Sequence, residues 1–186
     1  MLGSVSSGES NKFIDLFTAD LGRVHGVARS VREEKSKLRF SLQDFSFVEV
    51  SLVRGKDVWR VVGAESAYNI VSELKDREEE METVVRIISL IKRLLSGEDE
   101  NRELFALLSD AIDFLRSTIL TKEGLSNFEC LVVLRILYNL GYLAKDNTNA
   151  PFLENADLDT NLVSHITPLR FDMIKSINTS LQESQL

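Results

Sequence analysis

The chain has 186 residues, of which 44% are apolar and 27% charged, and its formal net charge is -7. Such a length is enough for one large domain or two small ones with a hydrophobic core. There is no run of about eighteen uncharged apolar residues, and the start MLGSVSSGES lacks the order of a secretory signal. We therefore expect a cytoplasmic protein without a membrane span.

Cysteine and histidine are scarce. Cys130 is the single cysteine, and the two histidines, His25 and His165, lie far apart in the sequence. This excludes an internal disulfide and any multi-cysteine zinc site. We expect no metal, no cofactor and no catalytic centre, because no P-loop, nucleophile elbow or metalloprotease motif is present either.

Charge is distributed unevenly along the chain. Residues 1–62 hold ten Lys or Arg and eight Asp or Glu, whereas residues 63–186 hold twelve and twenty-one. Between Arg23 and Arg39 six basic side chains face only two acidic ones, Glu33 and Glu34. A basic front half and an acidic rear half predict two modules with different partners.

The front half has the pattern of short strands. KFIDLFT (12–18) and GRVHGVARS (22–30) flank the turn ADLG, and Met1–Val5 provides a possible additional stub. In FSFVEVSLVR (45–54) apolar and polar residues alternate, the turn GKD (55–57) follows, and VWRVVG (58–63) completes a hairpin. This spacing predicts a small barrel or meander.

After Gly63 the apolar spacing becomes helical. Residues 78–95 and 101–117 carry apolar side chains three or four positions apart, with Glu78, Glu79, Glu80 and Glu82 at the start of the first stretch. Glutamates in that place suit the helix dipole, so we interpret them as a solvated helix start and not as a catalytic or metal-binding group.

A third helix is apolar on nearly every face. Ser126 and Glu129 have the spacing of a capping box, Gly141 is a C-terminal stop, and FECLVVLRILYNL between them predicts the buried centre of a bundle. Cys130 is expected there as a small buried hydrophobe. A polar loop (145–161) follows, and Thr167 and Pro168 look like the cap and first position of a last helix.

At three places the sequence resembles the bacterial recombination protein RecO family. The longest is GESNKFIDLFTADLGRVHGVARSVREEKSKLRFSLQDFSFVEVSL (8–52), and the others are NRELFALLSDAIDFL (101–115) and FECLVVLRILYNLGYL (128–143). Two differences from the family pattern are the short first strand, which leaves open whether Met1 is the native start, and the absence of the four cysteines that hold zinc in many members.

The resemblance implies an α+β protein: a small OB-type β-barrel with a truncated first strand (1–63) before an α-helical bundle (64–186) without a zinc finger. It implies a recombination mediator in DNA repair, not an enzyme, that binds single-stranded DNA, anneals complementary strands and helps to load the recombinase RecA onto DNA coated with single-stranded DNA-binding protein (SSB). Its implied partners are RecR and the acidic, apolar SSB tail, with RecA indirectly, and its implied location is the cytoplasm, at the nucleoid.

The residues expected to carry these functions form two sets. An OB barrel binds single strands with a basic groove and stacking platforms. The expected DNA-binding side chains are Arg23, His25, Arg29, Arg32, Lys35, Lys37, Arg39, Arg54, Lys56 and Arg60. The expected partner-binding side chains are Phe128, Leu131, Arg135 and Tyr138.

Each assignment has an alternative. The basic run is also compatible with a solvated loop that binds nothing, and Arg135 with a structural ion pair. Trp59 either stacks on a base or, as we prefer, packs into a core or interface. The same choice holds for Phe40, Phe45 and Phe47, at least some of which must fill the barrel. The alternative function is a protein-interaction module that acts through the acidic helical half without binding DNA.

Overall fold

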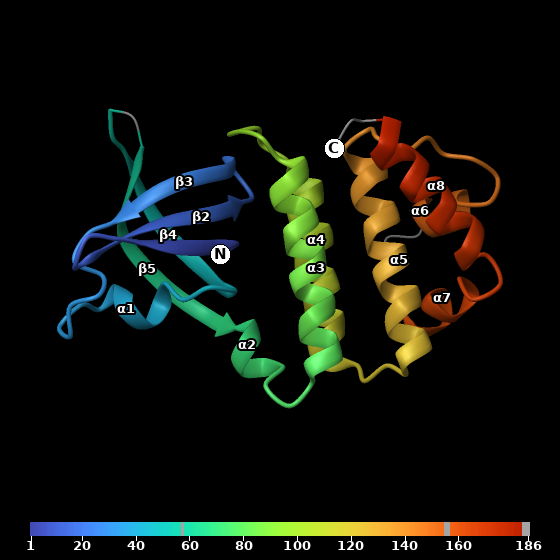
Figure 1. The fold of residues 1–186 in the computed structure, drawn as a ribbon, viewed down its shortest axis with the longest axis horizontal. Helices are drawn as coiled ribbons and strands as arrows, with labels where there is room; N and C mark the ends of the chain where they lie inside the picture. The colour runs from blue at the N-terminus through green and yellow to red at the C-terminus, as the bar shows by residue number, and fades with distance from the viewer. Residues whose placement is uncertain (57, 155–156, 184–186) are drawn as a thin grey trace. The chain divides into compact units, whose positions relative to one another are not determined.

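The computed structural model describes residues 1–56, 58–154 and 157–183. Its chain divides into two compact units: Met1–Arg77 together with Leu95–Asn101, and Glu78–Leu94 together with Arg102–Leu186 (Figure 1). Residue 57 of the predicted turn, residues 155–156 of the predicted polar loop, residues 184–185 of the predicted last helix and residue 186 lie outside the described residues. Within the described part, no helix is long and apolar enough to cross a membrane.

One five-stranded sheet builds the first unit, and its strand order is β1-β2-β3-β5-β4. All neighbours are antiparallel except β3 and β5, which pair in parallel at Gly26 with Trp59 and at Val27 with Arg60. The strands are β1 (Gly3–Ser7), β2 (Asn11–Thr18), β3 (Gly22–Ala28), β4 (Ser46–Arg54) and β5 (Trp59–Asn69). The strand prediction is therefore confirmed, and β5 continues past Gly63, where we had placed its end.

The sheet is open. Its two edge strands, β1 and β4, form no ladder, although the Met1 backbone nitrogen donates to the Ser46 carbonyl at 2.6 Å. A five-stranded, partly open barrel is the architecture of OB folds. The predicted α+β class with an OB-type first domain is thus confirmed, with an open sheet in place of a closed barrel.

The core of this unit is aliphatic. Ile14, Leu16 and Val24 are at most 2% exposed and lie on the inward face of β2 and β3, each burial stabilising the fold by about 1.5–3 kcal/mol. Val31 and Leu42 belong to the same cluster and so anchor both ends of the segment between β3 and β4. A short helix, α1 (Leu38–Ser41), lies in this segment.

The aromatic side chains behave differently from one another. Trp59 packs against the aliphatic core, which confirms the reading we preferred. The expectation that some of Phe40, Phe45 and Phe47 fill the barrel is wrong. Phe40 is 73% exposed on α1, Phe47 stacks on Tyr68 with ring centres 5.2 Å apart, and neither the core cluster nor the residues packed against it include any of the three.

Residues Leu95–Asn101, which we call the strap, belong to the first unit although helices precede and follow them in the chain. The Arg23 backbone N–H donates to the Gly97 carbonyl at 3.2 Å. Next to it, Gly22 has φ +66°, and a Cβ there would lie 2.1 Å from the Asp99 carbonyl oxygen. Glycine at the start of β3 therefore lets the strap approach the sheet closely.

The second unit is helical. Its first two long helices lie within a residue of the predicted ranges. The helices are α3 (Glu78–Leu94), α4 (Arg102–Ser117), α5 (Lys122–Asn139), α6 (Ala150–Glu154), α7 (Thr160–His165) and α8 (Arg170–Glu183), whereas α2 (Ile70–Glu73) belongs to the first unit. The predicted polar loop therefore contains α6 and the start of α7, and the last helix begins two positions after Pro168.

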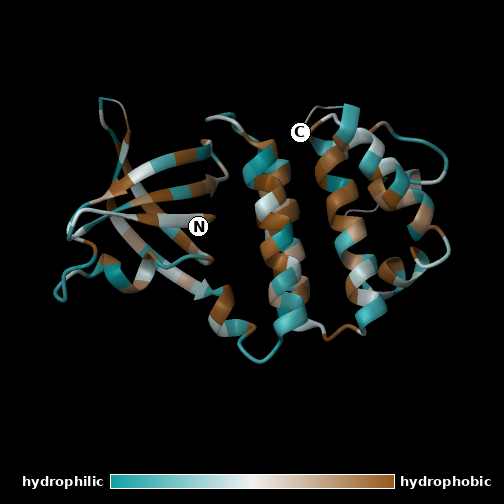
Figure 2. Cartoon of the chain, in the orientation of Figure 1, coloured by the Kyte–Doolittle hydropathy of each residue, from teal (hydrophilic) through white to brown (hydrophobic). Residues whose placement is uncertain are grey.

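Helix α5 is the centre of this unit, as predicted. It contacts α3, α4, α6, α7 and α8, and in Figure 2 apolar residues gather toward its C-terminal half, whereas its first turns are more hydrophilic. Its end at Gly141, with φ +77°, is confirmed, but its predicted start at Ser126 is wrong. Thr121 is the N-cap and accepts from the Gly124 N–H at 3.1 Å, whereas Ser126 lies inside the helix and donates to the Lys122 carbonyl.

Candidate nucleic-acid interface

The segment between β3 and β4 carries five exposed basic side chains, Arg29, Arg32, Lys35, Lys37 and Arg39. Except for Arg32, these side chains form no hydrogen bond or ion pair with another described residue. Because Val31 and Leu42 are buried on either side, the backbone of this basic loop is held against the domain while the charged ends stay in solvent. The loop thus presents positive charge to any anionic ligand.

Arg32 has a structural contact that its neighbours lack. Its side chain donates to the Gly8 carbonyl at 3.1 Å, and its backbone N–H donates to the Ser10 carbonyl at 3.0 Å. These bonds tie the basic loop to the turn between β1 and β2 (residues 8–10). In OB folds that turn, the β4–β5 turn and the face of strands 2 and 3 bind oligonucleotides.

Arg23 is engaged within the unit. Its guanidinium forms a two-point pair with Asp15, at 3.0 and 2.9 Å, and donates to the Leu95 carbonyl of the strap at 2.7 Å. The side chain is only 15% exposed. We therefore assign Arg23 to the attachment of the strap and leave it out of the candidate surface. His25, two residues on, is 65% exposed, with Nε2 3.7 Å from the same carboxylate.

The remaining predicted basic residues surround the β4–β5 turn (residues 55–58). Lys56 and Arg60 are exposed and make no side-chain bond to another described residue. Arg54 lies over the Trp59 ring, with its guanidinium carbon 4.7 Å from the ring centre, and pairs with Glu98 of the strap. The hydrogen bond from Arg54 lowers the pKa of Glu98, with a further contribution from the Trp59 N–H.

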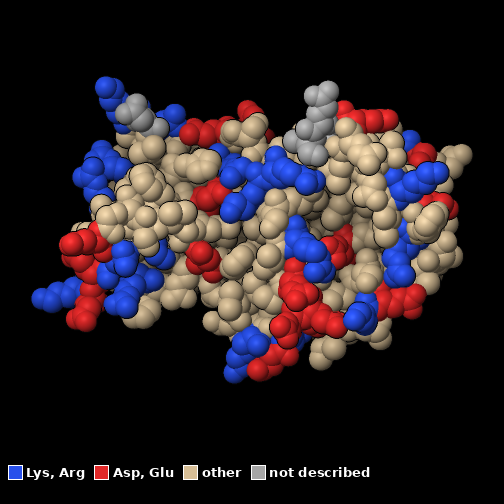
Figure 3. Space-filling view, in the orientation of Figure 1, with Lys and Arg blue, Asp and Glu red and all other residues tan. Residues whose placement is uncertain are grey.

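The outward face of β2 and β3 carries an exposed aromatic side chain, Phe13, that we did not predict. Phe13 is 50% exposed, whereas Ile14 and Leu16 of the same strand are buried. The alternation in KFIDLFT contains this information, because burial of Ile14 and Leu16 places Phe13 on the other face. In Figure 3 Lys and Arg side chains gather around an uncharged area of this unit, with some acidic side chains among them.

In the helical unit, two of the four predicted partner-binding residues are buried. Phe128 and Leu131 are 0% exposed, because α5 packs against other helices on most sides, so their assignment to a partner surface is wrong. Arg135 and Tyr138 line an open pocket of about 360 Å³ between α4, α5 and α6, which also contains the apolar side chains Leu107 and Leu153.

The Arg135 side chain is bonded within the helical unit. Its Nε donates to the Phe152 carbonyl at 2.8 Å, and burial lowers the pKa of this guanidinium, against the opposing influence of Asp110 and Asp157. Glu103 and Asp110 also line the pocket. The pocket therefore combines an apolar floor with one cation and an acidic rim.

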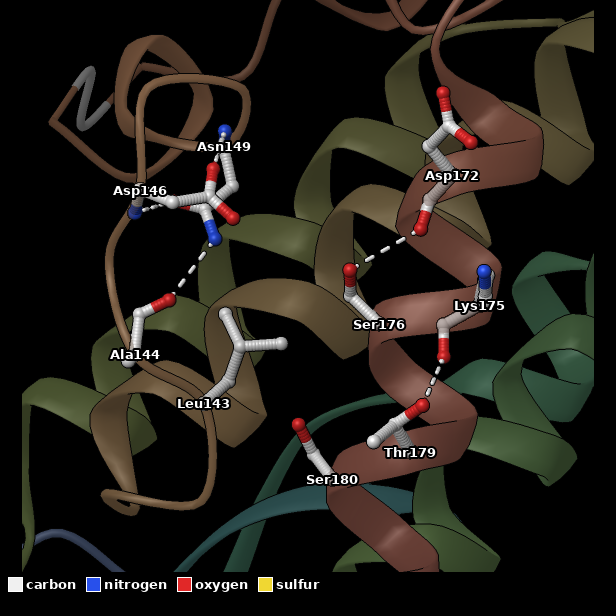
Figure 4. A pocket seen from close by; sticks show the side chains of 9 residues that line it. All are labelled: Leu143, Ala144, Asp146, Asn149, Asp172, Lys175, Ser176, Thr179 and Ser180. Carbon is white, nitrogen blue, oxygen red and sulfur yellow. Dashed lines mark hydrogen bonds between the residues drawn. The ribbon is translucent and has the colours of Figure 1, made fainter.

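A second hollow, of about 410 Å³, lies between α8 and the loop after α5 (Figure 4). Asp146 accepts from the backbone N–H groups of Thr148 and Asn149, and the Asn149 side chain donates to the Ala144 carbonyl at 3.0 Å. These hydrogen bonds all lie within the loop after α5. On the opposite wall, Ser176 and Thr179 bond to carbonyls of α8.

Among the described residues, no group of three His, Cys, Asp or Glu side chains is arranged to hold a metal ion. Cys130 is 5% exposed in α5, and burial raises the pKa of its thiol to about 11. This agrees with the prediction of a buried, unreactive cysteine.

The strand order, the parallel β3–β5 pair and the partly open sheet define an OB-type domain followed by a helical domain. Residues 1–69 match the family model described as "Recombination protein O N terminal". Residues 1–69 therefore belong to the N-terminal domain of the RecO family, as the sequence led us to expect.

Curated relatives support this assignment. Proteins named DNA repair protein RecO are 32% identical over 111 residues in Dehalococcoides mccartyi (60% of this chain and 44% of the relative) and 31% identical over 140 residues in Clostridium novyi (72% and 51%). One from Chlorobium limicola is 27% identical over 147 residues (76% and 54%). The chain spans about half the length of these relatives.

Proposed function

We propose that this protein acts in DNA repair and recombination by binding single-stranded DNA through the first unit. The observation that carries the proposal is a set of exposed basic side chains next to the two turns that OB folds use for oligonucleotides. Arg29, Arg32, Lys35, Lys37 and Arg39 lie on the basic loop, which Arg32 ties to the β1–β2 turn, and Lys56 and Arg60 lie at the β4–β5 turn. The family match of residues 1–69 supports the proposal, since the relatives are named DNA repair proteins.

The mechanism is binding without bond-making. Phosphates neutralised on the basic loop reduce the repulsion between two strands, which favours the annealing of complementary strands. In the same proposal the protein helps to replace SSB by RecA, with RecR as a further partner. These steps rest on the family resemblance, and the charged loop supplies a physical reason for the first of them.

The test is fluorescence anisotropy of a labelled thirty-nucleotide strand at several salt concentrations. Each phosphate contact contributes about 0.7 to the slope of log affinity against log salt. We expect tight, strongly salt-dependent binding, and for the variant K35E/K37E a lower affinity with a slope reduced by about 1.4. Annealing should decline in parallel.

The matched control is R93E/K175E, which makes the same charge change on two exposed side chains of the helical unit. It separates a local effect from the general effect of net charge. If both variants lose affinity equally, the basic loop does not form the DNA surface. Absence of binding by the unaltered protein at low salt overturns the proposal.

For the SSB tail, the pocket beside Arg135 and Tyr138 is the proposed site, because it offers a cation next to Leu107 and Leu153. Glu103 and Asp110, which also line the pocket, oppose an acidic peptide, so we expect weak binding. A labelled acidic, apolar-ended peptide titrated against Tyr138→Ala tests this. An unchanged affinity rules out this pocket.

The alternative, a protein-interaction module without DNA binding, is favoured by one observation. Phe171 is 81% exposed and Ile174 43% exposed on α8, which leaves an apolar strip on the surface of the helical unit. If the labelled strand does not bind, F171D becomes the variant to compare with the unaltered protein in a pull-down for a protein partner.

A further inference from the structure

A row of outward-facing side chains crosses the whole sheet of the first unit. Val5 pairs with Phe13, Phe13 with Val27, Val27 with Arg60, and Arg60 with Val53. Residues directly opposite each other point to the same face of a sheet. Val5 is 70%, Phe13 50% and Val53 45% exposed, so the row is an apolar strip interrupted by one arginine.

Phe13 is at the centre of the OB face. It lies on β2, and its partner Val27 lies on β3, the two strands whose face binds oligonucleotides in OB folds. A large aromatic side chain left half in water in the middle of a strand loses the burial that the same strand gives Ile14 and Leu16. Such exposure is typical of a binding surface.

Charge around the row selects the kind of ligand. Arg60 belongs to the row. Arg29 lies near it, because it directly follows Ala28, and Ala28 pairs with Lys12, the residue before Phe13 in β2. A ligand that fits must offer a flat apolar face to the ring and negative charge to the arginines. An unpaired nucleobase on its phosphate backbone has both properties, whereas the bases of a duplex are already stacked.

Other aromatic residues of this unit are less suited to the role. Trp59 packs against the core and donates its N–H to Glu98 at 3.0 Å. Phe47 stacks on Tyr68. Phe40 is exposed, but it lies on α1 and not on the sheet.

We propose that Phe13 is a base-stacking platform, on which an unpaired nucleobase stacks between Val5 and Val27 while Arg60 and Arg29 hold the adjoining phosphates. This inference rests on the proposed binding of single-stranded DNA. It adds a contact to the bases of the strand, whereas the basic side chains contact only its phosphates. Stacking tolerates any base, so the site discriminates single strands from duplexes and not one sequence from another.

The experiment compares Phe13→Ala with the unaltered protein on a thirty-nucleotide strand and on a deoxyribose-phosphate strand of the same length without bases. On the normal strand, F13A should weaken binding about 5- to 150-fold, with an unchanged salt slope because no phosphate contact is lost. On the strand without bases the two proteins should bind equally. F13W should restore affinity, F13L should not, and F40A, the exposed control, should change little.

A 2-aminopurine in the strand gives a second readout, since stacking on Phe13 should quench its fluorescence and F13A should abolish the quenching. If the unaltered protein and F13A bind equally tightly, the stacking proposal is overturned, although the proposed DNA binding stands. The apolar row would then be a candidate surface for a protein partner. If F13A weakens both strands equally, the ring supports the fold only. If the unaltered protein binds neither strand at low salt, the proposed function and this inference both fail.

Discussion

The Trp59 indole nitrogen donates a hydrogen bond to the Glu98 carboxylate over 3.0 Å, and Arg54 pairs with the same carboxylate from above the indole ring. The strap therefore places a negative charge beside the β4–β5 turn, where the proposed DNA surface ends. A phosphate that approaches Arg54 has to compete with Glu98. The strap carries two more acidic residues, Asp99 and Glu100, so its contact opposes strand binding at this end of the domain.

We predict that Glu98→Gln increases affinity for single-stranded DNA. Loss of the carboxylate charge frees Arg54 for one phosphate, so the salt slope should rise by about 0.7 along with the affinity. Asp99→Asn is the matched control, because it removes the same charge from the next residue without touching the pair. Equal effects of the two variants in the anisotropy titration would show a general change in charge and not a released arginine.

Gly22 provides a test of the strap itself. Alanine at this position costs about 1–2 kcal/mol for a left-handed backbone, and its Cβ would also collide with the Asp99 carbonyl, 2.1 Å away. Gly8→Ala is the control, because Gly8 has φ +64° with no atom within 4 Å of the added carbon. Both variants lose stability through φ, but only G22A should displace the strap.

Unfolding in urea gives the stability change of each variant, and a protease that cuts after glutamate reports on the strap through cleavage at Glu98 and Glu100. We expect faster strap cleavage in G22A than in G8A. Identical cleavage rates would mean that the close approach of Gly22 to Asp99 does not hold the strap in solution.

The long elements were predictable because their signals are local. Helix α3 has apolar residues at regular spacing, glutamates in the first turn and Lys92 and Arg93 in the last. Both of its ends can therefore be predicted from its own residues. The short helices α6 and α7 have no such signal. Asp159 caps α7 through the Leu162 N–H, but six residues are too few for a helical pattern, and tertiary packing decides whether they fold.

The candidate site was predicted only in part. The basic loop is evident from composition, but Arg23 looks the same as Arg29 in sequence, and only the register of β2 with β3 shows that Asp15 lies within its reach. The strap has no apolar period and binds the sheet through backbone groups such as the Gly97 carbonyl, which any sequence has. The exposure of Phe13 was predictable from the alternation of KFIDLFT, which puts it on the opposite face from Ile14 and Leu16.

The Asn127 side chain joins α5 to Thr167, which precedes α8, and to Arg170, the first residue of α8. It is 1% exposed, its amide donates to the Thr167 hydroxyl at 2.8 Å, and its carbonyl accepts from Arg170 at 2.9 Å. We predict that Asn127→Ala lowers the free energy of unfolding of the helical unit by about 1–3 kcal/mol, because two hydrogen bonds of about 0.5–1.5 kcal/mol each are lost. Ser126→Ala, one position away and exposed, should stay within about 0.5 kcal/mol.

Urea unfolding followed by far-ultraviolet circular dichroism measures both variants. The double variant N127A/T167A then separates the hydrogen bond from packing, since neighbouring residues that share a bond are not additive. If N127A and S126A have the same small effect, the hydrogen bonds of Asn127 do not hold these segments together in solution.

Cys130 should be nearly inert in the folded protein. With a pKa of about 11, roughly one thiol in a thousand is ionised at pH 8, compared with about one in four for an ordinary cysteine of pKa near 8.5. Burial in α5 restricts reagent access as well. The thiol should therefore react with Ellman's reagent more than about 100-fold faster in 6 M guanidinium than in buffer, and the rate in buffer should rise with pH up to about 11.

The chain has a single cysteine, so the unfolded protein is its own control. A rapid reaction at pH 8 in buffer would mean that the segment around Cys130 opens readily or that Arg170, which lowers the thiol pKa against the effect of burial, has the larger influence.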